Sequence, residues 1–437
     1  MGKSTRRMAA LVSAFVAMAG AAIAQNSSTS GHWVSAWSTA VQAPRTFPGM
    51  PPPLTFDDQT IRMVVRPTID GKKLRVRLSN ELGATPLSIG SVHVAIVKQD
   101  GEIIPESDHT LTFSGNSSVT IPAGAPMLSD PLVMEVHALE EIAISVFVPK
   151  ESAPSTFHLL GQHDTYISGQ GDFGGATEIP DFKVTKSWYW LSEVEFWTTN
   201  RTAAIVTLGD SITDGFGAKA QYGDWPNQLS ERLMAEKSAP ELSVDNEAIG
   251  GNRILHDGAG VSALTRFDRD VLSQPGVEDL IIMEGINDIG WPHMKPRSNP
   301  DGTARQNPWK GEMVTSDDLI EGMKQMIERA HEHGIRVFGA TMTPYGGNAG
   351  SFTDDGEAVR QAVNQWIRTS GMFDGVVDFD AVVRDPAQPD RFRDDLQTGD
   401  YLHPNAAGYK AMAAAFDLDA LRGNSRKVAK KTSAKTK

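Results

Sequence analysis

The hydrophobic pattern of the chain changes near residue 200. Before this point, short runs rich in β-branched residues alternate with turn residues, and Leu74, Val76 and Leu78 alternate with polar neighbours. Such alternation predicts strands that bury one face and expose the other, as in a sandwich or jelly roll. We predict strands at 60–66, 74–79, 91–97, 118–121 and 142–148, and hairpin turns at Asp70-Gly71 and Asp100-Gly101.

After residue 200, uniformly apolar runs alternate with amphipathic segments. The apolar runs predict buried strands at 203–208, 280–284, 336–341 and 375–379. The segments between them carry apolar residues at the spacing of one helix face, at 225–233, 319–330, 359–367 and 406–416. This alternation predicts a parallel sheet wrapped by helices. Because such sheets bind ligands beyond the carboxyl ends of their strands, we expect the functional residues at that edge.

The N-terminus has the pattern of a secretory signal peptide. Lys3, Arg6 and Arg7 precede an apolar run, and Ala22-Ile23-Ala24 forms an A-x-A cleavage site. The run is short for a membrane anchor, which is the alternative, and no other stretch approaches spanning length. We therefore predict a secreted or periplasmic protein cleaved near Ala24, by either Sec or twin-arginine export.

Composition narrows the possible chemistry. The 437 residues include no Cys, which excludes disulfides, thiolate zinc sites, iron–sulfur clusters and cysteine nucleophiles. Residues 25–421 carry 31 Lys and Arg against 54 Asp and Glu, so nucleic acid is not an expected partner. Residues 422–437 carry seven cations and no acid, which predicts a disordered tail, solvated or loosely attracted to anionic surfaces. The sequence does not indicate an oligomeric state.

Two segments carry residues suited to nucleophilic catalysis. Ser211 follows the first predicted strand in Gly209-Asp-Ser-Ile-Thr-Asp-Gly215, where it is a candidate nucleophile or simply a helix cap. Asp400 and His403 are separated by two residues. At this spacing the carboxylate can hold the Nδ1–H of the imidazole while Nε2 faces outward.

Two further loops offer donors for an oxyanion. Gly251 can present a backbone N–H, with Gly250 as the alternative, and the side-chain amide of Asn287 is a second donor. The N–H of Ser211, at the start of a helix, is a third.

These segments resemble, in order, the four sequence blocks of the SGNH (GDSL) hydrolases: Gly209-Asp-Ser211, Gly251 after Gly250, Gly285-x-Asn287-Asp288 and Asp400-x-x-His403. The resemblance covers about 202–421 and implies a flavodoxin-like three-layer α/β/α fold that hydrolyses carboxylic esters. It implies Ser211 as nucleophile, Asp400 and His403 as the rest of a triad, and Ser211, Gly251 and Asn287 as the oxyanion hole. No metal or organic cofactor is expected.

The resemblance extends to the first half, which is similar to a β domain found in some secreted bacterial members. We predict a signal peptide at 1–24, an all-β sandwich or jelly-roll domain at 31–195, an SGNH catalytic domain at 200–421 and the basic tail at 422–437. Trp291 and Trp309, in a long loop at 290–316, and Tyr345, after another strand, are predicted to line the substrate cleft.

The favoured function is an exported serine esterase. Its substrates are expected to be small-molecule or polysaccharide esters, with short-chain or acetyl esters of carbohydrates or aryl esters preferred. The alternatives are a lipase or lysophospholipase that takes longer acyl chains, and a carbohydrate-binding protein without activity.

Overall fold

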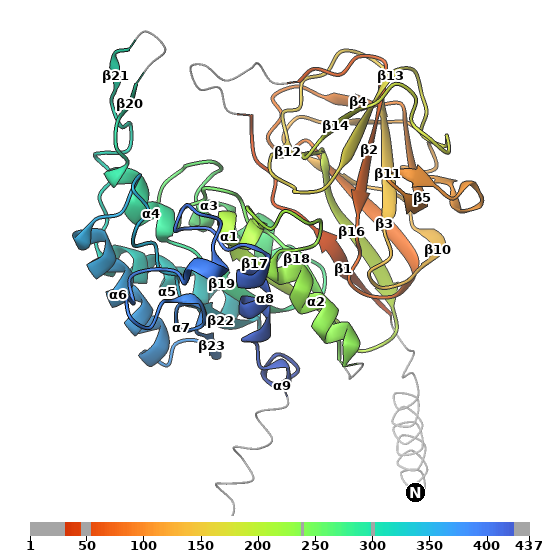
Figure 1. Cartoon of the computed structure of the whole chain (residues 1–437). Coiled ribbons are helices and arrows are strands. Elements are labelled where there is room, and N and C mark those ends of the chain that lie inside the picture. Colours follow the sequence, from red (N-terminus) through yellow and green to blue (C-terminus); the bar gives the residue numbers. More distant parts are fainter. Residues whose placement is uncertain (1–30, 45–53, 237–239, 299–301, 424–437) are drawn as a thin grey trace, which may run out of the picture.

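Antiparallel strands form the first half of the chain (Figure 1). The computed structural model describes residues 31–44, 54–236, 240–298 and 302–423, so the predicted signal peptide lies outside the described residues.

The strands of this half form two main sheets. One sheet contains β1 (His32–Ser38), β16 (Leu191–Thr198), β3 (Gly71–Ser79) and β10 (Leu132–Val136), with β9 (Pro126–Leu128) beside β3. The other contains β14 (Lys183–Thr185), β13 (Thr165–Gln170), β2 (Gln59–Val65), β11 (Ile142–Val148), β5 (Ser91–Gln99) and β6 (Glu102–Ile103), with β7 (His109–Thr110) beside β5. Two short pairs complete this half, β4 (Leu87–Ile89) with β8 (Val119–Ile121) and β12 (Phe157–His158) with β15 (Trp188–Tyr189).

The two sheets share one hydrophobic core, as the alternating pattern predicts. Val76 of β3 and Ile144 of β11 belong to the same buried cluster. The predicted turn at Asp100-Gly101 is confirmed: both residues have positive φ, and the flanking strands β5 and β6 pair. The predicted hairpin at Asp70-Gly71 is wrong, because the strands on either side of it, β2 and β3, lie in different sheets.

A five-stranded parallel sheet forms the second half. Its order is β18 (Glu241–Asn246), β17 (Thr202–Gly209), β19 (Val277–Met283), β22 (Arg336–Ala340) and β23 (Gly375–Val377). This is the 2-1-3-4-5 order of flavodoxin-like folds. We predicted all of these strands except β18. Side chains of β17 point alternately to two cores, one shared with α2 (Trp225–Ala235), α7 (Phe379–Val383) and α8 (Ala406–Ala414). The other is shared with α3 (Ala263–Phe267), α5 (Ser316–Glu332) and α6 (Asp354–Thr369). The predicted three-layer α/β/α fold class is confirmed.

The first strand of the chain also contacts the parallel sheet. Directly after β1, Thr39 forms a parallel bridge to Asn246 at the end of β18. The hydroxyl of Ser38 donates to the buried carboxylate of Glu247, and the N–H of Ser35 donates to the carbonyl oxygen of Pro275 over 2.9 Å. The edge strand β18 is therefore covered by the β-sandwich, which removes an exposed sheet edge.

The C-terminal end of the described chain is packed onto the α/β half. The buried guanidinium of Arg422 donates to Glu236 over 2.9 Å and to the carbonyl oxygen of Leu233 over 3.1 Å. Arg422, the first residue of the predicted tail, therefore belongs to the folded part of the chain. Among the described residues, no helix has the length and apolarity needed to cross a membrane.

The junction between the two halves predicts a pH-dependent stability. Asp245 of β18 is fully buried, and burial raises its pKa to about 7. The folded chain therefore retains this proton between about pH 4 and pH 7, where an unfolded aspartate with a pKa of about 3.9 has lost it. We expect the free energy of unfolding to fall as the pH rises through this window. In Asp245→Asn the fall between pH 5 and pH 8, measured by urea titration, should shrink by about 3 kcal/mol.

The exposed Asp57 provides the control, and Asp57→Asn should retain the wild-type dependence on pH. A steep fall that persists unchanged in Asp245→Asn would show that the buried carboxylate is not its source.

Candidate active site

Ser211 lies where β17, an interior strand of the parallel sheet, ends and the one-turn helix α1 (Ser211–Asp214) begins. Asp210 caps this helix, and its carboxylate accepts the N–H of Ile212 over 2.9 Å. The preceding Gly209 is required by close packing, because an added Cβ would lie 2.7 Å from the carbonyl oxygen of Met283. The strand end thus holds Ser211 at the edge where the sequence predicts it.

His403 is hydrogen-bonded to Ser211 on one side and to Asp400 on the other. The Oγ of Ser211 lies 2.8 Å from Nε2, and Nδ1 lies 2.5 Å from Oδ2 of Asp400. A carboxylate only accepts, so Nδ1 carries the proton and Nε2 accepts the hydroxyl proton of Ser211. Chain positions 192 residues apart meet at this point.

The Asp400 carboxylate has three donors. Besides the imidazole, Oδ1 accepts the backbone N–H groups of Leu402 and His403, each over 2.9 Å. Burial alone would raise the pKa of Asp400, but the hydrogen bonds from His403 hold it well below its usual range. Tyr401, which lies between Asp400 and Leu402 in the chain, has a φ of 58°. This left-handed conformation costs about 1–3 kcal/mol and recurs at functional sites. The loop is thus held so that Asp400 stays ionised beneath the ring.

The glycine loop, residues 247–252, resolves the choice between two neighbouring donors. The N–H of Gly250 is bound to Oδ2 of Asp214 over 2.9 Å. In the described part of the chain, the N–H of Gly251 meets no acceptor. Gly251 has a φ of 81°, which favours glycine. The structure therefore leaves Gly251, as predicted, with the N–H available to a bound group.

Asn287 is anchored to the same loop. It lies in α4 (Ile286–Gly290), directly after β19, and its Nδ2 donates to the carbonyl oxygen of Asn252 over 3.0 Å. The neighbouring Asp288 is buried, and its two oxygens accept the N–H groups of Ile254 and Leu255 over 2.7 and 3.0 Å. Since an amide nitrogen carries two hydrogens, Asn287 retains one for a ligand.

Buried acids behind the site have raised pKa values. Burial raises the pKa of Asp210 to about 7 and that of Glu284 well above its usual range. A protonated carboxyl carries no charge, so these groups oppose negative charge developing near Ser211 less than ionised ones do.

The predicted substrate-binding residues divide into two groups. Trp291 is partly exposed and packs on the glycine loop, where a Cβ added to Gly251 would lie 2.9 Å from the indole. The ring of Trp309 lies 4.6 Å from that of Trp291. Tyr345 is fully buried among core residues of the α/β half, against Phe352, so the prediction that it lines the cleft is wrong.

Two apolar residues at the site were missed from the sequence. Phe216 is 41% exposed, and its ring lies 4.5 Å from that of His403. Leu160, from the β-sandwich, lies over Gly250: a Cβ added there would be 2.9 Å from Leu160 and 3.9 Å from the Cβ of Ser211. Phe216 follows the Gly209–Gly215 segment and could be suspected from it. No sequence signal brings Leu160 to the site.

The second half of the chain is similar to known proteins. Residues 207–411 match the model of the GDSL-like Lipase/Acylhydrolase family. A lipolytic protein of the G-D-S-L family from Desulfitobacterium hafniense DCB-2 is similar at 20% identity, over 49% of this chain and 97% of that chain, with a TM-score of 0.35. A GDSL-like lipase from Bacteroides thetaiotaomicron VPI-5482 is 18% identical, over 50% and 88%, with a TM-score of 0.35. An acetyl xylan esterase from Geobacillus stearothermophilus is 20% identical, over 50% and 94%, with a TM-score of 0.36. No curated protein matches the chain.

Gly251 offers a test of the loop geometry. In Gly251→Ala the added Cβ meets Trp291 and the positive φ is disfavoured, so the N–H should be displaced. We expect kcat for ester hydrolysis to fall by about 10-fold or more, because a misplaced donor loses part of the 10²–10³ that such a group supplies.

Gly334 is the matched control, since it has a φ of 75° and open space around its Cβ position. Gly334→Ala should lose about 1 kcal/mol of stability with kcat unchanged. Equal kcat values in the two variants would mean that the Gly251 N–H takes no part in the reaction.

Proposed function

We propose, on the premise that residues 207–411 are a GDSL-like lipase/acylhydrolase domain, that this chain hydrolyses carboxylic esters through an acyl-enzyme on Ser211. The observation that carries the proposal is the continuous hydrogen-bonded path from the Ser211 hydroxyl through His403 to Asp400. A serine hydroxyl is a weak nucleophile until a base takes its proton, and this path supplies the base with its orienting group.

The steps follow from the path. Nε2 of His403 accepts the Ser211 proton as Oγ attacks the ester carbonyl carbon, and Asp400 stabilises the imidazolium that forms. The imidazolium then gives that proton to the departing alcohol oxygen, which leaves an acyl group on Oγ. Water repeats the sequence, losing a proton to Nε2 as it attacks the acyl carbon, and Ser211 regains its proton as the acid departs.

Three donors would stabilise the oxyanion of each tetrahedral intermediate. They are the backbone N–H groups of Ser211 and Gly251 and the free amide hydrogen of Asn287. The N–H of Ser211 is the first of a helix and has no partner within it. Donors that are fixed before the reaction cost no reorganisation when the charge appears.

A short acyl group suits the space beside the glycine loop. Leu160 lies over Gly250 and Trp291 over Gly251, so apolar side chains close the loop on both sides. Phe216 is more open and could stack against an aryl or sugar leaving group. The proposed substrates are therefore acetyl or other short-chain esters of carbohydrates or aryl alcohols.

Hydrolysis rates on a series of aryl esters from acetate to laurate test the preference for short acyl groups. A preference for laurate would favour a lipase.

Export is part of the proposal and rests on the sequence of residues 1–24. Cell fractionation and the N-terminal sequence of the mature protein test it, with cleavage expected near Ala24.

Ser211→Ala should lower kcat on an aryl acetate by about 10⁶, because the nucleophile is removed. The substitution deletes one oxygen at a partly exposed turn, so the thermal unfolding temperature should change little. Continuous spectrophotometry with the two purified proteins measures the ratio. Substantial remaining turnover in Ser211→Ala would refute the acyl-enzyme mechanism.

Asn287→Ala should lower kcat by about 10² to 10³ and leave KM nearly unchanged, because the amide contacts the oxyanion more strongly than the ground-state carbonyl. Steady-state kinetics separate the two constants. A raised KM with the wild-type kcat would instead make Asn287 a substrate contact. Asn116→Ala is a suitable control, since Asn116 is exposed on the β-sandwich and its side chain donates to the neighbouring carbonyl oxygen of Ser114.

A further inference from the structure

The β-sandwich places a buried histidine at the catalytic edge of the parallel sheet. His158, in β12, is 1% exposed and lies between two oxygen acceptors. Its Nδ1 is 2.8 Å from the carbonyl oxygen of Ala40, and its Nε2 is 3.0 Å from Oδ1 of Asp214. The second contact joins the two halves of the protein.

Asp214 links His158 to the glycine loop. It is the last residue of α1, three positions after Ser211, and its Oδ2 accepts the N–H of Gly250 over 2.9 Å. The next peptide carries the N–H of Gly251. A hydrogen-bonded chain thus runs from His158 through Asp214 to the residue beside the proposed oxyanion donor.

Both ring nitrogens of His158 face an oxygen atom. Both of its partners are oxygen acceptors, so an imidazolium facing a carboxylate satisfies both contacts. Burial lowers the pKa of His158, but the Asp214 carboxylate outweighs this and raises it. Removing one partner of a buried pair of this kind leaves the other charge uncompensated.

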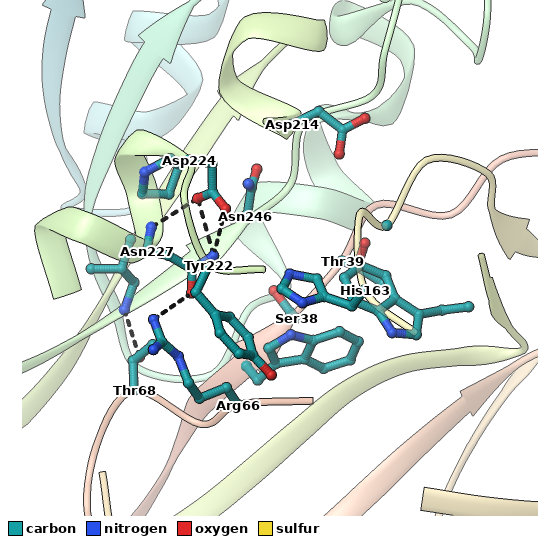
Figure 2. Close-up of a pocket in the computed structure, with 15 residues that line it drawn as sticks. Ser38, Thr39, Arg66, Thr68, His163, Asp214, Tyr222, Asp224, Asn227 and Asn246 are labelled. Carbon is teal, nitrogen blue, oxygen red and sulfur yellow. Dashed lines mark hydrogen bonds between the residues drawn. The ribbon is translucent and has the colours of Figure 1, made fainter. Parts of the chain in front are cut away.

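Other contacts hold the same region from the β-sandwich side. The side chain of Gln42 donates to the carbonyl oxygen of Ala259, which packs against Gly251. A cavity of about 30 Å³, the size of one water molecule, lies between the halves. Figure 2 shows it lined by Thr39 and His163 from the β-sandwich and by Asp214 and Asn246 from the α/β half.

We propose that His158 is a positioning residue for ester hydrolysis: by fixing the Asp214 carboxylate, it holds the Gly250 peptide so that the N–H of Gly251 points at the oxyanion. The proposal rests on the proposed function. Through His158, the β-sandwich would therefore contribute to the reaction although this residue does not contact the substrate.

Two substitutions separate the contacts of the ring. The amide of Asn can replace Nδ1 and keep the bond to Ala40 while losing Asp214, and the longer Gln can replace Nε2 and keep the bond to Asp214. We expect His158→Asn to lower kcat about 10- to 100-fold with KM nearly unchanged, as part of one oxyanion donor's effect is lost. His158→Gln should restore kcat to within about 3-fold of wild type.

Inhibition by phenylboronic acid adds a second readout, because its tetrahedral serine adduct mimics the intermediate. Its Ki should rise in parallel with the loss of kcat in His158→Asn and recover in His158→Gln. His93→Asn is the matched control, since His93 is also an imidazole of the β-sandwich that faces a carboxylate, with its Nδ1 3.0 Å from Oδ2 of Asp108. It should keep the wild-type kcat and Ki whatever its effect on stability.

Asp214→Ala keeps the inference testable should His158→Asn fail to fold. It should lower kcat similarly, and the double variant should lose no more than the larger single loss. Wild-type kcat and Ki in His158→Asn or in Asp214→Ala, or equal losses in His158→Asn and His158→Gln, would overturn the positioning role. Ser211→Ala with wild-type turnover would instead refute the proposed function itself, so the two failures are distinguishable.

Discussion

The buried guanidinium of Arg266 fixes the catalytic edge of the sheet. It donates to the carbonyl oxygens of Gly209 and Glu247 over 3.3 and 2.5 Å, and to the side chains of Asn252 and Asp270 over 2.9 Å each. Carbonyl groups at the ends of parallel strands lack a neighbour in the ladder, and a buried acceptor without a donor costs about 1–3 kcal/mol. One side chain thereby joins the end of β17, where the Gly209 carbonyl oxygen also accepts the N–H of Ile249, to the glycine loop. We therefore expect the distance between the proposed nucleophile and the proposed oxyanion donors to depend on Arg266.

Two imidazole–carboxylate pairs flank α1, and their surroundings give them different capacities. His403 is 14% exposed and has an acceptor at Nδ1 but a hydroxyl at Nε2, so it can take and return a proton. His158 is enclosed, with acceptors at both nitrogens, so its protons are held in place. We therefore propose that the same pair of residue types transfers a proton on one side of Ser211 and holds Asp214 in place on the other.

Local patterns predicted much of the fold and the proposed catalytic groups, because strand ends and short motifs are set within a few residues. Contacts that depend on how side chains pack could not be found this way. Tyr345 follows a strand at the expected edge, yet its ring turns into the core. The choice of Gly251 over Gly250 depends on a hydrogen bond from Gly250 to Asp214. His158 lies 56 residues from Asp214 in another sheet system, and nothing in the sequence links them.

The contacts between the β-sandwich and the α/β half indicate that the functional unit includes both halves of the chain. The family match begins at residue 207, but the edge strand β18 has its neighbour in β1, and Glu247 of the glycine loop accepts from Ser38. A buried carboxylate without such a donor pays its full desolvation cost. The α/β half by itself would therefore expose a sheet edge, and Glu247 and Asp214 would each lose the hydrogen bond that the β-sandwich supplies, from Ser38 and His158 respectively. The β-sandwich thus supplies side chains that contact the proposed active site, and we expect the two halves to function as one unit.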